Sequence, residues 1–418
     1  MPTSVGPNTF GEENLVFSYD LGDVSTSYKG EPATNSQDYD KSVMTQAGFD
    51  AWGCYDGNNS SPNYHYWGNA QSKTLVNIPG PDGKYVNAML YHNFTGGFHG
   101  PTNWSGVASS LLTNGSKITV QGWVKAADAA SVGKTVSPHL YYGKIGGGSY
   151  SSSTSYTLTA EWQLVSHSYT VPEGSTGTGT MYFFTSGGTN IKMYLTKTAI
   201  VGGRVHAIQW LPGGTTRSTT QGLLDLTGNS TINLINVSFD SNAKPTWDGT
   251  DDYIAVTRRQ YGVNEAWTTE LVFKPTDDAD TSWNGLFGGG LAAGGYWMFH
   301  SAGNLAYYEG YDGTTRITYR GWTKANTFTA GIYHHLTITY TPTSATTGAY
   351  SLYYNGGEKT DSFNWTFGWS YSLDMQFIGA GDGRFGTNDI HYFKQYDRAL
   401  TASEIKSNYN AIKGRFNI

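Results

Sequence analysis

Apolar and polar residues alternate with a period of two in many short stretches of the chain. Such stretches run over 15–19, 118–124, 271–273, 336–340 and 350–354. A period of two is that of a half-buried β-strand, and Gly, Asn, Ser and Thr between the stretches supply turns. Asn355-Gly356, directly after one alternating run, is a strong hairpin signal. Many short strands with frequent turns predict a sandwich or jelly roll.

Only one segment has a helical pattern. Thr401 and Glu404 have the spacing of a capping box, and Ile405, Tyr409 and Ile412 then recur at helical intervals. We expect this helix to end near Gly414. The predicted fold class is therefore all-β, with two β-sandwich or jelly-roll domains and one short C-terminal helix.

The composition agrees with this class and excludes several functions. The chain has 418 residues with 31 Tyr, 13 Trp, 18 Phe and 54 Gly, while charged residues make up only 14%. Its net charge of −6, without any Lys/Arg cluster, argues against nucleic-acid binding. The apolar runs are too short to cross a membrane, and the start carries no signal-peptide pattern. With Cys54 as the single cysteine, we expect a chain made in a cytosol without internal disulfides.

Six segments of the C-terminal half form a recognisable series: 247–254, 267–275, 334–340, 351–356, 377–379 and 390–405. In order and spacing, between about 246 and 412, they resemble the laminin-G-like branch of the concanavalin A-like lectin/glucanase fold. The resemblance implies a folding pattern and does not by itself supply a binding site.

The stretch from about 31 to 204 differs. Its segments 116–125, 164–171 and 190–200 resemble strands of the carbohydrate-binding jelly rolls found beside glycanases. Residues 14–22 look like the opening strand of the lectin-like module, which in such proteins soon precedes a segment like 222–229. We therefore expect 1–30 and 205–418 to form one lectin-like domain, with 31–204 inserted into a surface loop. The alternative is two consecutive domains with an N-terminal arm.

Glycanases on the lectin-like fold carry acids on one strand in a Glu-x-Asp-x-x-Glu pattern, and this pattern is absent from the sequence. The acids near predicted strands stand alone and are expected to be solvated: Glu265, Glu270, Glu309 and Glu358. We therefore expect no enzymatic activity and no catalytic residues.

Two clusters raise the question of a metal. Asp248, Asp251 and Asp252 offer oxygens that Ca²⁺ would accept, but Asp-Gly and Thr-Asp-Asp are also ordinary turn sequences, which is the interpretation we favour. His334 and His335 are adjacent on a strand, so they point to opposite faces and cannot chelate one Zn²⁺; core packing plus a surface histidine is expected. We expect neither a bound metal nor a cofactor.

Aromatic residues in loop-like, Asn/Gly-rich sequence are the remaining signal. Sugar rings stack on Trp and Tyr, while polar side chains read the hydroxyls. The glycan-binding candidates are Trp52, Tyr64, Tyr66, Trp67, Trp104, Trp283, Tyr308, Tyr311 and Trp322. For any single one of them, packing at an interface with a neighbouring subunit is the favoured alternative.

This combination of modules resembles the virion surface proteins of tailed bacteriophages. The resemblance implies a non-enzymatic capsid decoration, fibre or tail appendage, made in the host cytoplasm and displayed on the virion surface. Its partners would be other virion proteins, further copies of itself and a host or environmental polysaccharide. The alternatives are a stand-alone glycan-binding lectin and, with less support, a glycanase or depolymerase.

Overall fold

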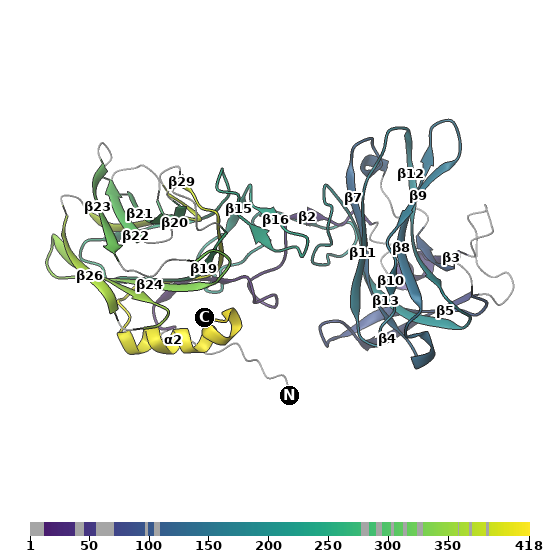
Figure 1. Ribbon diagram of the computed structural model, residues 1–418, viewed down its shortest axis with the longest axis horizontal. Helices are drawn as coiled ribbons and strands as arrows, with labels where there is room; N and C mark the ends of the chain where they lie inside the picture. The colour runs from purple at the N-terminus through teal and green to yellow at the C-terminus, as the bar shows by residue number, and fades with distance from the viewer. Residues whose placement is uncertain are drawn as a thin grey trace. The chain divides into compact units, whose positions relative to one another are not determined.

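A computed structural model gives the fold of the chain (Figure 1). The structure describes residues 12–37, 46–55, 71–96, 99–103, 109–276, 284–289, 295–301, 305–311, 316–323, 329–357, 359–367, 370–381 and 384–418. The fold class is all-β, as predicted, with strands in several sheets and a helix at the C-terminus.

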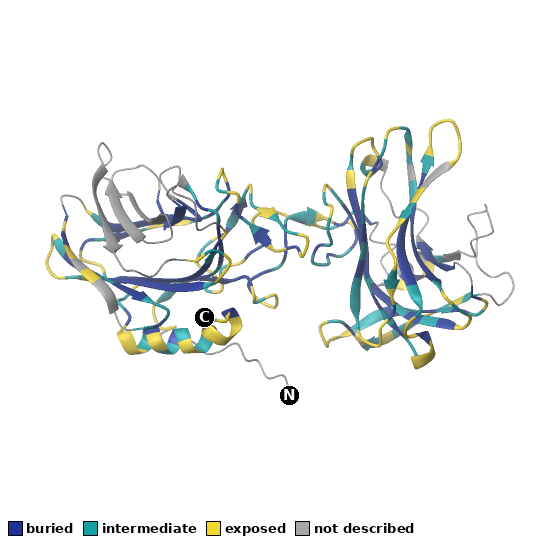
Figure 2. Ribbon diagram, in the orientation of Figure 1, coloured by how far each residue is buried: buried dark blue, intermediate teal, exposed yellow. Residues whose placement is uncertain are grey.

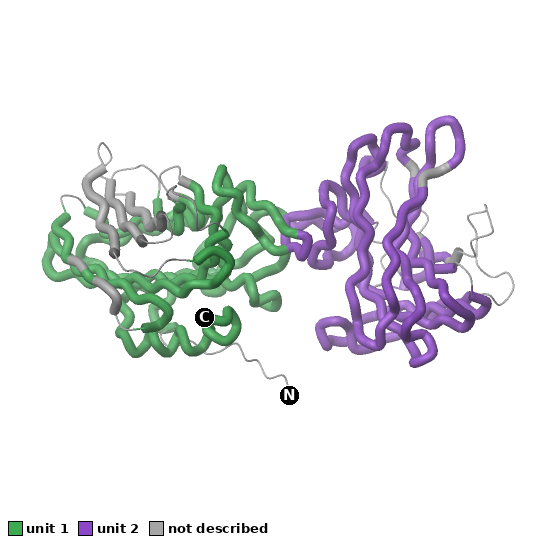
Figure 3. The backbone as a smooth tube through the Cα atoms, in the orientation of Figure 1, with its two compact units in different colours: residues 1–30, 218–240, 244–418 green, residues 31–217, 241–243 purple. Residues whose placement is uncertain are grey.

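The chain divides into two compact units (Figure 3). Unit 1 contains residues 1–30, 218–240 and 244–418, and unit 2 contains 31–217 with 241–243. Unit 2 therefore interrupts the sequence of unit 1. Unit 1 resumes at 218 rather than at the expected 205, because Ile208 and Leu211 are buried against Ala199 and Val201 of unit 2.

Unit 1 has two antiparallel sheets. The six-stranded sheet has the order β1 (Leu15–Asp20), β30 (Asn388–Tyr396), β19 (Trp267–Pro275), β24 (His334–Pro342), β25 (Thr347–Tyr354) and β26 (Lys359–Thr366). The seven-stranded sheet has the order β15 (Asn233–Ile235), β18 (Tyr253–Gly262), β27 (Tyr371–Ile378), β20 (Asn284–Gly288), β21 (Gly295–Ser301), β22 (Leu305–Tyr311) and β23 (Arg316–Thr323). Two short ladders join β16 (Ser238–Phe239) to β17 (Pro245–Thr246) and β28 (Ala380–Gly381) to β29 (Arg384–Phe385).

The core of unit 1 lies between these sheets. Trp267 of β19 is fully buried, with Tyr340 stacked on it at 6.0 Å and Tyr350 edge-on at 5.9 Å between ring centroids. The Tyr340 hydroxyl donates to the Val263 carbonyl and that of Tyr350 to the Ser372 carbonyl, so these large rings are buried without losing their hydrogen bonds. Strand β19, which spans the segment 267–275 of the resemblance, thus lies at the centre of the sandwich.

Helix α2 (Ala402–Phe416) covers the outer face of the six-stranded sheet, which lies dark blue beside it in Figure 2. The predicted capping box is present: Thr401 accepts from the Glu404 backbone N–H, and the Glu404 side chain accepts from the Thr401 backbone N–H. The helix continues two residues beyond Gly414, because the left-handed residue that ends it is Asn417. Arg415 then pairs with the buried Asp20 of β1 at 2.5 Å.

Unit 2 is a second sandwich. Its five-stranded sheet has the order β11 (Gln163–Thr170), β7 (Lys117–Ala126), β13 (Ile191–Gly202), β5 (Tyr85–Asn93) and β4 (Gln71–Pro79). The facing sheet has the order β10 (Tyr156–Thr157), β8 (Thr135–Lys144), β12 (Ser175–Ser186), β6 (Gly100–Asn103) and β3 (Gly53–Tyr55), with β9 (Ser149–Ser153) also on β8. The short helix α1 (Gln46–Ala51) and the ladder of β2 (Ala33–Thr34) with β14 (Thr216–Arg217) complete it, together with 3-10 turns at Ser109–Leu111 and Ala129–Ser131.

The two sheets of unit 2 approach closely at Gly122. A Cβ atom at this position would lie 2.9 Å from the ring of Phe183 on the facing sheet. Strand β7 therefore needs glycine here, although glycine weakens a strand interior.

Candidate functional site

The outer face of the seven-stranded sheet, opposite the core, carries a charged pair. Arg258 of β18 reaches Asp374 of β27 with two hydrogen bonds, Nε to Oδ1 at 2.8 Å and Nη2 to Oδ2 at 2.6 Å. Asp374 is fully buried, whereas the Arg258 side chain keeps 39% of its surface exposed. A Cβ at Gly289 would lie 2.6 Å from the Asp374 carboxyl group. The pair raises the pKa of the Arg258 guanidinium, which stays charged and faces solvent.

Three aromatic side chains lie on the same sheet region. Tyr253 of β18 meets Phe377 of β27 edge-on at 5.2 Å and Phe385 of β29 at 6.0 Å between ring centroids. All three are only partly buried. Ile254 and Ile378, the next residues on β18 and β27, lie in the core, so the trio belongs to the outer face. We call Tyr253, Phe377 and Phe385 the aromatic trio.

The backbone register continues from Phe377 across the neighbouring strands of the sheet. Phe377 pairs with Gly288, Gly288 with Trp297, Trp297 with Glu309, and Glu309 with Tyr319.

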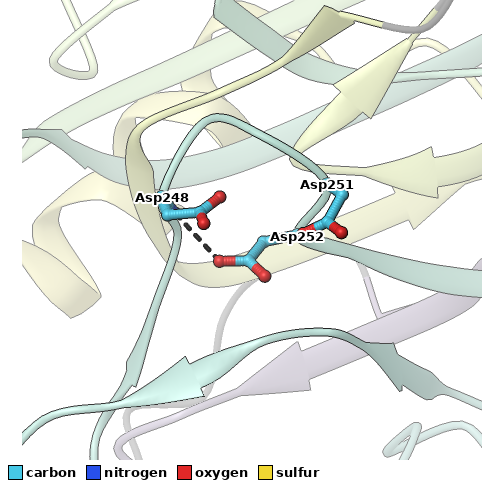
Figure 4. A group of neighbouring side chains, drawn as sticks. All are labelled: Asp248, Asp251 and Asp252. Atoms are coloured by element: carbon cyan, nitrogen blue, oxygen red, sulfur yellow. Dashed lines mark hydrogen bonds between the residues drawn. The ribbon is translucent and has the colours of Figure 1, made fainter.

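The three aspartates that precede the trio in sequence lie close together (Figure 4). Each of Asp248, Asp251 and Asp252 offers one oxygen, and these atoms lie within 4.8 Å of one another. Asp252 is buried and its Oδ2 accepts from the Asp248 backbone N–H at 2.9 Å, while Asp248 Oδ1 accepts from the Thr250 N–H at 2.7 Å. Burial and the two neighbouring carboxylates raise the pKa of Asp252 to about 6. These residues could hold a cation, but Ca²⁺ takes six to eight oxygens, and two of the carboxylates already order the turn.

Unit 2 carries an aromatic cluster on the outer face of its β8/β12 sheet. The rings of Tyr182 and Phe184 stack at 4.8 Å, and His139 meets both edge-on, at 6.0 and 5.0 Å. Tyr141, 39% exposed, stands edge-on to Tyr182 at 6.4 Å. The intervening residues Leu140, Met181 and Phe183 fill the core, so the cluster faces away from it. Burial and the nearby His167 lower the pKa of His139 to about 4, so its imidazole is neutral at pH 7.

A hollow of about 300 Å³ opens at another part of unit 2. The residues that line it are Thr34, Ser36, Leu111, Ser116, Lys117, Gly202 and Gly203. Its volume would suit a small polar ligand, but among these described residues only Lys117 bears a charge.

The structure places the glycan-binding candidates predicted from the sequence in different environments. Trp52 is not a loop platform: it is 1% exposed and packs against Phe183 at 6.2 Å in the core of unit 2, so this prediction is wrong. Tyr308 and Tyr311 lie in β22 and Trp322 in β23, so they are strand rather than loop residues; their side chains are outside the described part. Five candidates lie outside the described residues altogether: Tyr64, Tyr66, Trp67, Trp104 and Trp283.

The prediction that the lone acids are solvated is wrong for Glu270. Glu270 is fully buried, and its Oε1 accepts from His335 Nε2 at 2.8 Å while its Oε2 accepts from Asn408 of α2 at 2.9 Å.

His334 and His335 do face opposite ways, because His334 contacts Phe273 in the core region at 5.7 Å. Neither histidine is at the surface, since both are at most 1% exposed. Glu265 is exposed as expected, whereas Glu358 and the Glu309 side chain lie outside the described residues.

The aromatic trio and the Tyr182 cluster were missed by sequence reasoning. Met181, Tyr182, Phe183 and Phe184 are consecutive and apolar, so alternation alone cannot tell which pair faces the core. The structure decides it through the register of β12 against β8, in which Tyr182 pairs with His139 on the outer face.

Comparison with known families finds one similarity, which lies in unit 1. A laminin-G-type model of the concanavalin A-like lectin/glucanases superfamily matches residues 248–406. The matched residues are similar to that superfamily over the part of the chain that contains the six segments described above. Among curated proteins none matches the chain.

Solved structures with similar parts include the two that follow. The binding domain of botulinum neurotoxin serotype D is 16% identical, with 46% of this chain and 49% of that chain covered and a TM-score of 0.34. The CBM22-1 xylan-binding domain of Paenibacillus barcinonensis Xyn10C is 15% identical, with 43% and 97% covered and a TM-score of 0.30. The chain thus spans about half the length of the neurotoxin domain. No helix in the described residues has the length and apolar character needed to cross a bilayer.

Proposed function

We propose that this protein is a non-enzymatic, glycan-binding structural protein on the surface of a virion. The observation that carries the binding part is the aromatic trio, which lies on the same outer face of the seven-stranded sheet as Arg258. Partly exposed rings give a sugar a stacking surface, and the fixed guanidinium donates hydrogen bonds to hydroxyls. The lectin/glucanase match of residues 248–406 supports this assignment.

The carboxylates of unit 1 support a role without hydrolysis. Glycoside hydrolysis needs two carboxyl groups presented to the substrate on either side of the scissile bond. Each strand carboxylate of unit 1 with a described side chain is buried and paired with a base. These are Asp20 with Arg415, Glu270 with His335, Asp374 with Arg258, and Asp389 with Lys274. None of these four is free to act as acid or nucleophile.

The virion placement rests on the architecture. Two sandwich units without disulfides suit a protein assembled in a cytosol, since the chain has only one cysteine. Other virion proteins and further copies of the chain are the proposed partners. Many copies on one particle would convert weak single sites into strong attachment through avidity.

Binding is tested with the full chain on a glycan array that includes bacterial surface polysaccharides. Tyr253→Ala and Phe377→Ala should each weaken binding by roughly tenfold, in line with ~1–2 kcal/mol for a lost stacking contact. Tyr85→Ala is the matched control, because Tyr85 is 70% exposed and lies in unit 2. Absence of binding to any glycan would refute the binding role.

Virion placement needs a separate experiment. Mass spectrometry of purified particles and a density map of the assembly should contain the chain in many copies. A soluble monomer without particle association would contradict the placement and would leave the stand-alone lectin as the explanation.

A further inference from the structure

The five-stranded sheet of unit 2 carries a second patch, separate from the surfaces described above. Lys125 of β7 extends its ammonium over two rings, 5.2 Å from the centroid of Trp162 and 5.5 Å from that of Tyr194. The two ring centroids are 6.4 Å apart at 45°. Both rings and the Lys125 side chain are partly exposed. We call Lys125, Trp162 and Tyr194 the lysine–aromatic patch.

The patch lies on the outer face of this sheet. Val124 and Ala126, which flank Lys125, are core residues, and so are Met193 and Leu195, which flank Tyr194. Lys125 and Tyr194 are direct partners in the register of β7 with β13. Partly exposed Trp123 and Leu164, paired between β7 and β11, continue the apolar surface beside it.

The geometry of the patch is fixed before any ligand arrives. The Trp162 indole N–H donates to the Pro79 carbonyl at 2.9 Å, which ties its ring to the end of β4. The ammonium of Lys125 is restrained by two cation–π contacts. A ligand therefore loses little affinity to the ordering of these side chains.

Charge pairing distinguishes Lys125 from its neighbours. Lys192 pairs with Asp128 at 3.4 Å, and Lys197 pairs with Asp82 at 3.2 Å. Within the described part of the chain, no carboxylate forms an ion pair with Lys125. An uncompensated cation held against aromatic rings matches a ligand that combines an anionic group with a sugar-ring face.

We propose that the lysine–aromatic patch binds polysaccharides that contain uronic acids, with the sugar carboxylate on the Lys125 ammonium and the ring face against Trp162 or Tyr194. This deepens the proposed glycan-binding function by naming a ligand class. It concerns a different sheet in a different unit from the aromatic trio, so each site can fail alone.

The experiment uses the full chain and two forms of one polymer, polygalacturonate and its highly methyl-esterified form, in affinity electrophoresis or calorimetry. Polygalacturonate should bind, and the ester, whose carboxylates are neutralised, should bind about tenfold or more weakly. That is the loss expected for a charge-assisted contact. Rising salt should weaken the polygalacturonate complex.

Variants locate the site. Lys125→Met keeps the aliphatic stem of the side chain and should reduce the affinity for polygalacturonate to that for the ester. Trp162→Ala should reduce the affinity for both polymers. Tyr253→Ala in unit 1 should leave both affinities unchanged. Thermal melting confirms that each variant folds.

Three outcomes overturn the proposal: equal binding of acid and ester, unchanged binding by folded Lys125→Met, or equal binding of poly-L-glutamate, which has carboxylates but no sugar. If Tyr253→Ala abolishes array binding while Lys125→Met changes nothing, the proposed function stands and the patch is excluded. If the reverse holds, the trio is excluded.

Discussion

Arg258 on β18 grips the fully buried carboxylate of Asp374 on β27 with two hydrogen bonds, while the adjacent Arg259 pairs with Asp397 near the surface. The two arginines are successive in sequence, but their ion pairs contribute differently to the stability of the fold. Removing one partner of a buried pair leaves a charge without compensation, whereas exposed pairs contribute little.

Arg258→Ala should therefore destabilise the protein by about 2 kcal/mol, a figure reduced from the fully buried case because Arg258 itself is 39% exposed. Arg259→Ala is the control and should cost no more than ~0.5 kcal/mol. Urea denaturation measures both. Adding Asp374→Asn to Arg258→Ala should recover part of the loss, and equal losses for the two arginines would contradict the assignment.

Asp252 should make stability fall as pH rises. Its folded pKa of about 6 lies above the ordinary 3.8, so the folded state holds the proton that the unfolded state has already lost between these values. This contribution is fully present below about pH 4 and is lost as pH passes 6. Asp252→Asn keeps an oxygen for the Asp248 N–H and should remove the difference. Melting curves of both proteins from pH 3.5 to 7.5 test this, and parallel profiles would count against it.

Calcium should have no effect on stability. Asp248 and Asp252 already accept backbone hydrogen bonds within their turn, and the cluster brings together one oxygen from each of three carboxylates, whereas Ca²⁺ takes six to eight oxygens. Melting temperatures in millimolar Ca²⁺ and in EDTA should agree. A higher melting temperature in Ca²⁺ that Asp251→Asn abolishes would establish a cation site instead.

Asn408 should be a strong anchor of helix α2. Its side chain donates to Glu270 at 2.9 Å and to the Tyr396 hydroxyl at 3.3 Å, so Asn408→Ala removes a donor from a buried carboxylate. We expect a loss of about 1–3 kcal/mol in the free energy of unfolding. Asn410, exposed on the same helix, provides the control variant Asn410→Ala, which should change little. A loss of the same size in both variants would show a helix-propensity effect only.

The sequence predicted the elements whose signals are local. The Thr401–Glu404 capping box needs four residues, and the strand from Trp267 to Pro275 shows its end through a proline that cannot donate to the ladder. The features missed depend on distant pairing. Glu270 looked solvated because nothing nearby in sequence announces His335 or Asn408, and Trp52 looked like a loop residue because its partner Phe183 is 131 positions away.

The candidate surfaces were missed for the same reason. Tyr253, Phe377 and Phe385 come from three strands and meet only through the register of the seven-stranded sheet and its neighbouring hairpin. The boundary at 217 likewise depends on the packing of Ile208 and Leu211 rather than on a change in composition.

Binding without cleavage is tested most directly by incubating the full chain with polysaccharides that it retains on an array and assaying the release of reducing ends. The expected result is retention of the glycan by the native chain, loss of retention in Phe377→Ala, and no reducing ends above the blank. Release of reducing ends by the native chain would mean that a pair of carboxyl groups does face the substrate, and the protein would then be a hydrolase.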